Sequence, residues 1–241
     1  MTPARDLVRE KAARAWRFRC GVEQEAHLRF ARLAGWLGDC RFARPLVDLA
    51  LRASSDESRH AIRCAELSLQ FGATAPDPLT TAPAPLAPAG LPSRAAVLYE
   101  VVAACCVTET GSFGVLTTLL GLVRGGPLRR ILRELAADEV QHSRLGWAAL
   151  SNERDRGTTS LLAPFVPAML EGSIDAGLFQ PGTPEEEDGA LLELGVLPHS
   201  LKREVFTRTT LDVVLPGLSA AGVDPGPARL WLAGKMRGLA P

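Results

Sequence analysis

Apolar residues recur every three or four positions along four long stretches of this chain, which is the spacing of one buried face on an α-helix. The stretches cover about residues 4–38, 42–71, 93–123 and 127–151. Pro45 and Pro127 stand in the first turns of two of them, and Gly72 follows the end of another, as is typical of helix termini. The pattern therefore predicts an all-α protein built on four helices.

The second and third predicted helices are joined by a segment, 75–92, that holds six prolines and cannot be helical. As extended polyproline it would cover about 3 Å per residue, or roughly 50 Å in all. A helix of about 25 residues is only about 38 Å long. The segment can therefore cross over along the whole length of a helical bundle. A flexible linker between separate domains is the alternative.

Residues 152–241 have a less regular pattern. Pro164 and Pro167 interrupt an apolar stretch, and a helical pattern returns after Pro198. We expect residues 1–151 to form the four-helix bundle and residues 152–241 to form a helical extension packed on it. The extension would either cover the bundle or provide the contact of a homodimer, and the sequence does not decide between these roles.

Composition narrows the classes of partner. The 241 residues are 46% hydrophobic and 22% charged, with a formal net charge of zero, so a well-packed core is expected. No long basic run is present, which argues against nucleic acid and anionic membranes as partners. The first 19 residues lack the apolar segment of a secretion signal, and we expect that no apolar run reaches membrane-spanning length. We expect a soluble cytoplasmic protein.

Five cysteines lack the Cys-x-x-Cys spacing of a metal or redox motif. They are Cys20, Cys40, Cys64, Cys105 and Cys106. An odd number in a cytoplasmic protein argues against a disulfide framework. Most buried cysteines simply pack as small apolar residues, and we expect the same here.

One pattern of chemically active residues occurs twice on the predicted helices. The first copy is Glu23 followed by Asp56-Glu57-Ser58-Arg59-His60, and the second is Glu109 followed by Asp138-Glu139-Val140-Gln141-His142. Residues three apart share a helix face, so each Glu-x-x-His pair can ligate one metal centre. Both copies lie within apolar stripes, where an unpaired glutamate is costly. The alternative is two solvated helix faces that match by chance.

Four carboxylates and two imidazoles are the ligand set of a four-helix bundle that holds two metal ions. The candidate ligands are Glu23, Glu57, His60, Glu109, Glu139 and His142. This set suits two iron ions, with manganese or a mixed iron and manganese pair as alternatives. Four carboxylates neutralise two divalent ions, and the open coordination positions would accept O2.

Asp56 and Asp138 precede the glutamate of each Glu-x-x-His pair. Each can accept a hydrogen bond from the histidine of the opposite copy, Asp56 from His142 and Asp138 from His60. That bond would leave the other ring nitrogen free for metal. The alternative is a solvent-exposed aspartate. Arg59 is expected to pair with an aspartate of this network.

On the first helix, Glu23 lies on the apolar face and is expected to point inward. Glu25 lies among arginines and is expected to pair with Arg29. His27, one turn beyond Glu23, is a hydrogen-bonded structural residue, a seventh ligand or a substrate contact, and the first is the commonest role of such a histidine.

Gly111 and Gly114 follow Glu109 in the third helix, where each glycine costs about 1 kcal/mol relative to alanine. A local bulge, space for a substrate or close helix packing would compensate, and we expect close packing. Ser112 either places a hydroxyl near bound oxygen or packs in the core, and core packing is the expectation.

At these motifs the sequence resembles the ferritin-like di-iron carboxylate superfamily, and within it the oxygenases and oxidases that include the p-aminobenzoate N-oxygenases. Those proteins repeat a Glu followed about 28–37 residues later by Asp-Glu-x-x-His. The resemblance covers about residues 14–151. It implies a ferritin-like bundle with the proline-rich crossover between helices 2 and 3. Leu135 departs from the family, because the arylamine N-oxygenases have an additional histidine there.

The resemblance implies an O2-dependent non-haem di-iron oxidoreductase. Such an enzyme would hydroxylate, N-oxygenate or desaturate a small-molecule substrate with an external electron donor. A ferroxidase or other iron-handling protein without an organic substrate is the alternative, and a bundle that keeps metal only as a structural staple is a third reading. The 90 residues beyond the bundle favour the enzyme, because a storage subunit needs little more than the bundle.

Overall fold

The computed structural model describes residues 3–74, 76–81 and 83–238, and every regular element within these ranges is a helix. The all-α prediction is confirmed. In chain order the elements are α1 (Pro3–Asp39), α2 (Arg44–Phe71), α3 (Ser93–Val101), the π-helix η1 (Val102–Glu109), α4 (Thr110–Leu122), α5 (Gly126–Arg154), the 3-10 helix η2 (Ser160–Phe165), α6 (Val166–Gly172), the 3-10 helix η3 (Gly189–Leu194), α7 (His199–Thr209), the π-helix η4 (Thr210–Val214), α8 (Leu215–Ala220) and α9 (Gly226–Arg237).

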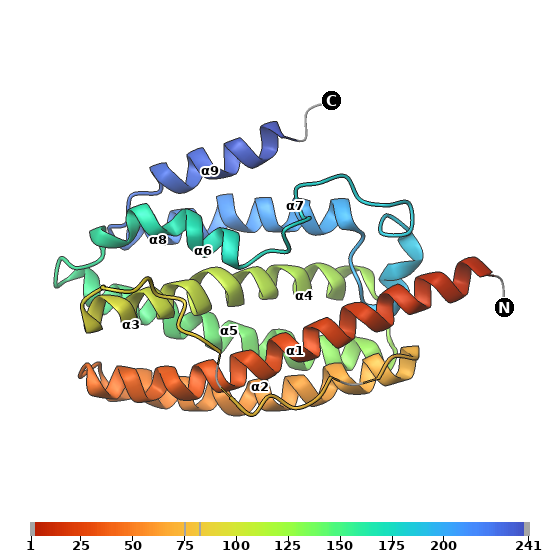
Figure 1. Cartoon of the computed structure of the whole chain (residues 1–241), viewed down its shortest axis with the longest axis horizontal. Coiled ribbons are helices and arrows are strands. Elements are labelled where there is room, and N and C mark those ends of the chain that lie inside the picture. The colour runs from red at the N-terminus through yellow and green to blue at the C-terminus, as the bar shows by residue number, and fades with distance from the viewer. Residues whose placement is uncertain (1–2, 75, 82, 239–241) are drawn as a thin grey trace.

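Two helical hairpins form the bundle (Figure 1). The first is α1 with α2, and the second is the continuous rod of α3, η1 and α4 with α5. Gly72 ends α2 with a φ of 105°, and its N–H group donates to carbonyls of the last turn, which is the role that glycine performs best because it lacks a Cβ atom. Ser93 is the first residue of α3, and Pro92 directly before it is the N-cap.

The proline-rich segment between Gly72 and Pro92 runs back along the bundle from the end of α2 to the start of α3 (Figure 1). Its Ala75 and Ala82 lie outside the described residues. Arg29 of α1 donates to the carbonyl of Ala84 at 3.2 Å, and Glu100 accepts from the N–H of Ala87 at 3.0 Å. These bonds tie the segment to α1 and α3, so it is a crossover within one bundle.

The ligand positions fall between two apolar clusters on every helix of the bundle. On α1, buried residues within 8–20 belong to one cluster and those within 30–37 to the other. On α5, the same division separates 132–136 from 145–149. The two clusters thus close the interior above and below a polar layer and exclude water from it.

The third helix, predicted over about 93–123 with a local bulge as one alternative near its glycines, is not α-helical throughout. Its central segment η1 is a π-helix that ends at Glu109. The hydroxyl of Thr108 donates to the carbonyl of Ala103 at 3.0 Å, five residues earlier. Threonine hydroxyls thus satisfy a carbonyl group in the widened turns. Wide turns of this kind often occur at functional sites.

The two glycines after Glu109 have different surroundings. A Cβ atom on Gly114 would lie 2.5 Å from the hydroxyl oxygen of Thr209 on α7, whereas one on Gly111 would meet no atom within 4 Å. Close packing, as predicted, accounts for Gly114. It does not account for Gly111, which borders open space.

One stretch, Ser93–Leu122, is long and apolar enough to cross a membrane by length and composition. The expectation that no run reaches this length was therefore wrong. In its most apolar window, 56% is buried inside the protein, and Val101, Cys105 and Leu116 are fully covered. The stretch forms the third helix of the bundle, and its buried residues belong to the core.

Most helices after α5 pack against the third rod, whereas the 3-10 helix η3 packs against α1. Leu162, Leu170, Leu215 and Leu218 are buried in one cluster with residues of α3 and η1. In Figure 1, α6, α7 and α8 form a layer over α3 and α4, with α1 and α2 on the other side. The extension thus covers one side of the bundle.

Gly146 of α5 allows the closest approach between α5 and η1. A Cβ atom there would lie 2.6 Å from Sγ of Cys106, 2.7 Å from Cβ of Cys105 and 3.0 Å from the backbone nitrogen of Cys106. We expect Gly146→Ala to lower the free energy of unfolding by about 1–3 kcal/mol, because the core has to shift. Urea denaturation measures this.

Gly35→Ala on α1 is the matched control. A Cβ atom there meets nothing within 4 Å, so the substitution should raise stability by up to about 1 kcal/mol. Equal effects of the two substitutions would contradict the close approach.

Candidate metal centre

All six candidate ligands lie in the polar layer of the bundle. Glu23 comes from α1, Glu57 and His60 from α2, Glu109 from the end of η1, and Glu139 and His142 from α5. None of the six has more than 6% of its surface exposed. This burial rules out the alternative in which the two motifs lie on solvent-exposed helix faces.

The ligand atoms form two overlapping donor sets, each with its atoms within 4.8 Å of one another. One set is Glu57, Glu109, Glu139 and His142, and the other is Glu23, Glu57 and His60. Glu57 belongs to both sets. The arrangement provides two adjacent positions that can hold metal ions, with one carboxylate between them, and is compatible with a ferritin-like fold.

Each histidine turns one nitrogen toward the ligand carboxylates and the other toward an aspartate. Nδ1 of His60 lies 3.0 Å from Oε2 of Glu57, and Nε2 lies 3.1 Å from Oδ2 of Asp138. Nδ1 of His142 lies 3.3 Å from Oε2 of Glu139, and Nε2 lies 3.3 Å from Oδ2 of Asp56. The crosswise pairing expected from the repeat is present, and it leaves both Nδ1 atoms facing the ligand layer.

Arg59 joins the two aspartates. Its guanidinium donates to Asp56 at 2.7 Å and to Asp138 at 2.9 Å. The Arg59 side chain is 49% exposed, so this bridge forms the solvent edge of the site. It holds both carboxylates in the orientation that receives the histidine N–H groups.

A buried oxygen without a partner tests whether metal fits this layer. Oε1 of Glu57 makes no hydrogen bond, although it lies 2.9 Å from Nδ1 of His142. The short distance is not a hydrogen bond, because its angles do not suit one. A buried carboxylate oxygen needs a partner, and a metal ion shared by the two donor sets would provide one.

Two further residues contact the ligands and were not predicted to do so. Arg19 donates from Nε to Oε1 of Glu23 at 2.9 Å, and its Nη2 lies 3.5 Å from Oε1 of Glu139. Ser112 donates to that same Glu139 oxygen at 2.8 Å and accepts from Nη2 of Arg19 at 2.9 Å. Ser112 thus does more than pack in the core. The available signal was the position of Arg19, one turn before Glu23 on its apolar face.

Other candidates lie outside the ligand layer. His27 Nδ1 is 2.7 Å from the carbonyl oxygen of Ser54, so this histidine joins α1 to α2 and is no seventh ligand. Glu25 is exposed and lies 3.9 Å from Arg29, as predicted. The five cysteines are free thiols, and none belongs to a donor set.

The four glutamates influence one another strongly in the metal-free protein. Burial raises the pKa of Glu109, and the charge of Glu139 raises it further. Burial also raises the pKa of Glu23, and nearby Glu57 adds to the effect. For Glu57, burial acts in the same direction, but the nearby charge of His142 and the hydrogen bond from His60 outweigh it and lower the pKa. Positive charge in this layer would therefore stabilise the ionised glutamates.

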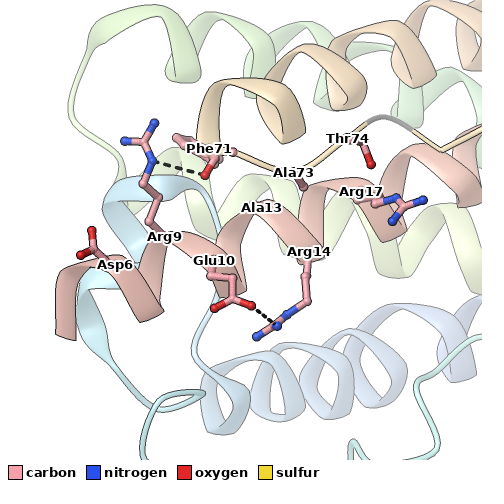
Figure 2. A pocket seen from close by; sticks show the side chains of 10 residues that line it. Asp6, Arg9, Glu10, Ala13, Arg14, Arg17, Phe71, Ala73 and Thr74 are labelled. Atoms are coloured by element: carbon pink, nitrogen blue, oxygen red, sulfur yellow. Dashed lines mark hydrogen bonds and ion pairs between the residues drawn. The ribbon is translucent and has the colours of Figure 1, made fainter. Parts of the chain in front are cut away.

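Two surface pockets lie apart from this layer. One of about 360 Å³ lies between the N-terminal part of α1 and the end of α2 (Figure 2). Arg9 there donates to the carbonyl of Phe71, and Glu10 pairs with Arg14. A second, of about 300 Å³, borders α9 at Trp231. Neither contains a candidate ligand.

A scan against protein-family models gives no match to this chain, and a search of curated proteins gives none either. The assignment of a candidate metal centre therefore rests on the buried carboxylate and histidine cluster alone.

Asp56→Ala and Asp138→Ala should each weaken metal binding by about 10–100-fold, because each releases the ring of a histidine ligand. Titration of the metal-free variants with Mn(II) measures this, and circular dichroism checks that the helices remain. Asp48→Ala, on the same helix as Asp56 but exposed and paired with Arg44, is the matched control. Wild-type affinity in both test variants would show that these aspartates do not support the ligands.

Metal affinity should rise with pH. Burial alone would lower the pKa of His60, but the hydrogen bond to Glu57 and its charge outweigh burial and raise the pKa to about 9. For His142, the hydrogen bond to Glu139 and the nearby charge of Glu57 likewise outweigh burial and raise the pKa to about 11. Both histidines are then protonated at pH 7, and metal has to displace a proton from each. Mn(II) titrations between pH 6 and 9 test this.

The same protons stabilise the metal-free fold. An unfolded histidine has a pKa near 6.5, below the folded values of about 9 and about 11. The stabilisation is complete below about pH 6.5 and is lost as the pH rises through 9 and towards 11. The free energy of unfolding of metal-free protein should therefore fall over the range in which metal affinity rises. A fall in both quantities would contradict the assignment of these pKa values.

Proposed function

We propose that this protein is a non-haem di-iron oxidoreductase that uses O2 to oxidise a small organic molecule. The two donor sets that share Glu57 carry the proposal, because they provide two adjacent metal positions inside one bundle. Carboxylate and imidazole donors suit iron, with manganese as the alternative. When bound, the two ions would supply electrons for the reduction of O2.

The protein's own residues have distinct roles in this proposal. Glu109, Glu139 and His142 would hold one ion, Glu23 and His60 the other, and Glu57 both. Asp56, Asp138 and Arg59 orient the histidines. These side chains are held in fixed positions because each of them lies on a long helix. A redox centre needs such rigid placement of its ligands.

Water exclusion supports oxidation chemistry at this place. The ring of Phe30 packs 5.5 Å from the ring of His142, and apolar clusters close the layer on both sides. A dry site protects a reactive centre from side reactions. Open space borders Gly111, beside Glu109 in sequence, and we propose this region for the substrate.

The extension distinguishes this chain from a plain bundle. Helices α6 to α8 cover α3 and η1, and this layer adds surface that an iron-storage subunit does not need. We propose that an external donor supplies electrons and that the free cysteines fit a reducing, cytoplasmic location. A homodimer contact through the extension is a further element of the proposal.

Metal-free protein loaded with Fe(II) without oxygen should bind two iron ions per chain. Glu57→Ala should reduce this number because it removes the shared ligand. Glu66→Ala on the same helix, exposed and paired with Arg63, should not. On mixing with O2, the bound Fe(II) should oxidise once, with a change in visible absorption, and iron uptake should stop there.

Two outcomes would contradict the proposal that the protein is an oxidising enzyme. Oxidation of hundreds of Fe(II) ions per chain within a large cage would favour the iron-handling alternative. A bound di-iron centre that never reacts with O2 would favour a structural metal. Iron content near zero in the wild type would refute the site itself.

A further inference from the structure

The two metal positions of the centre are not equivalent. One donor set offers four residues, Glu57, Glu109, Glu139 and His142, and the other offers three. The glutamates of the two Glu-x-x-His pairs stand at the same place in the repeat. If the two copies were equivalent, each of these glutamates would be a ligand of both metal positions. Glu57 belongs to both sets, but Glu139 belongs to only one.

The unequal role of Glu139 has a local cause. Its Oε1 atom accepts a hydrogen bond from Ser112 at 2.8 Å and lies 3.5 Å from Nη2 of Arg19. Oε1 of Glu57 has no such donor. An oxygen that already accepts from a hydroxyl and faces a guanidinium is less available to a metal ion.

Each of these two donors occurs in only one copy of the repeat, Arg19 in the first copy and Ser112 in the second. Arg19 stands four residues before Glu23, and the matching place before Glu109 is Cys105. Ser112 stands three residues after Glu109, and the matching place after Glu23 is Ala26. Both polar residues act on Glu139, and neither has a polar counterpart that acts on Glu57.

Arg19 also acts on the three-residue position directly. Its Nε atom donates to Oε1 of Glu23 at 2.9 Å, which leaves Oε2 as the oxygen free for metal. Its side chain is only 19% exposed, so solvent screens its charge poorly. A fixed positive charge beside a cation position opposes the cation.

We propose that Arg19 and Ser112 make metal loading sequential. The position formed by Glu57, Glu109, Glu139 and His142 fills first, and the position formed by Glu23, Glu57 and His60 fills second and more weakly. Arg19 then sets the metal concentration at which the centre becomes complete. This inference rests on the proposed two-metal function.

Binding of Mn(II) to metal-free full-length protein tests the inference without any turnover. Electron paramagnetic resonance distinguishes free Mn(II), one isolated bound ion and a coupled pair. The wild type should show an isolated ion first and a coupled pair only at about tenfold higher free Mn(II) or more, the ratio given by about 1.4 kcal/mol.

Arg19→Gln removes the charge and should bring the two steps together. Arg19→Lys keeps the charge and should keep the steps apart, although lysine lacks the forked geometry. Ser112→Ala frees one oxygen of Glu139 and should narrow the gap in part. Arg17→Gln, an exposed arginine on the same helix, is the matched control and should behave as the wild type.

The metal-free variants give a second, independent readout. Arg19→Gln leaves Glu23 without its cation, so its melting temperature without metal should be lower than that of the wild type. Mn(II) should then raise the melting temperature more in the variant. If Arg19→Gln does not fold, Ser112→Ala still tests the unequal positions.

The outcomes separate this inference from the proposed function. Two ions that bind with equal affinity in the wild type, or steps that Arg19→Gln and Ser112→Ala leave unchanged, would overturn the inference and leave a two-metal centre. Loss of the second ion in folded Arg19→Gln would also overturn it. No Mn(II) binding by the wild type would overturn both.

Discussion

Four glutamate side chains share one layer of a helical core from which water is largely excluded, and the rest of the structure compensates for that concentration of negative charge. Burial and the neighbouring carboxylates raise the pKa of Glu23 and Glu109, and such buried carboxylates remain costly until they pair with cations. In the metal-free protein those cations are the protonated histidines and Arg19. Metal ions would replace the protons, but Arg19 keeps its charge.

Apolar packing between the helices positions these charged groups. Apolar stripes above and below the layer turn one side of each helix inward, and the missing side chain of Gly146 lets α5 approach the π-helix that ends at Glu109. The later helices then shield this third rod. The result is a polar layer whose members have little freedom to move apart.

Much of the fold could be predicted because it depends on periodicity and local chemistry. Helix ends at Gly72 and Pro127 follow from backbone constraints, and the repeat itself placed Asp56 opposite His142. The π-helix could not be predicted from its apolar run of valine, alanine and cysteine. These residues do not indicate whether each backbone N–H group bonds to the carbonyl four residues earlier or to the carbonyl five residues earlier. Arg19 was missed because an arginine on a helix usually faces solvent, and only tertiary structure shows it among carboxylates. The surroundings of Gly114 likewise depend on α7, which no local pattern places.

Each hairpin completes the histidine pairs of the other, and the crossover from Gly72 to Pro92 is the covalent link between the hairpins. Encoded as separate chains, the two hairpins would have to find each other by diffusion, and the site would disappear on dilution. A tether that matches the span holds its ends at an effective concentration of about millimolar. Prolines stiffen the tether and leave it fewer conformations to lose on folding. Assembly of the layer is thus independent of how much protein is present.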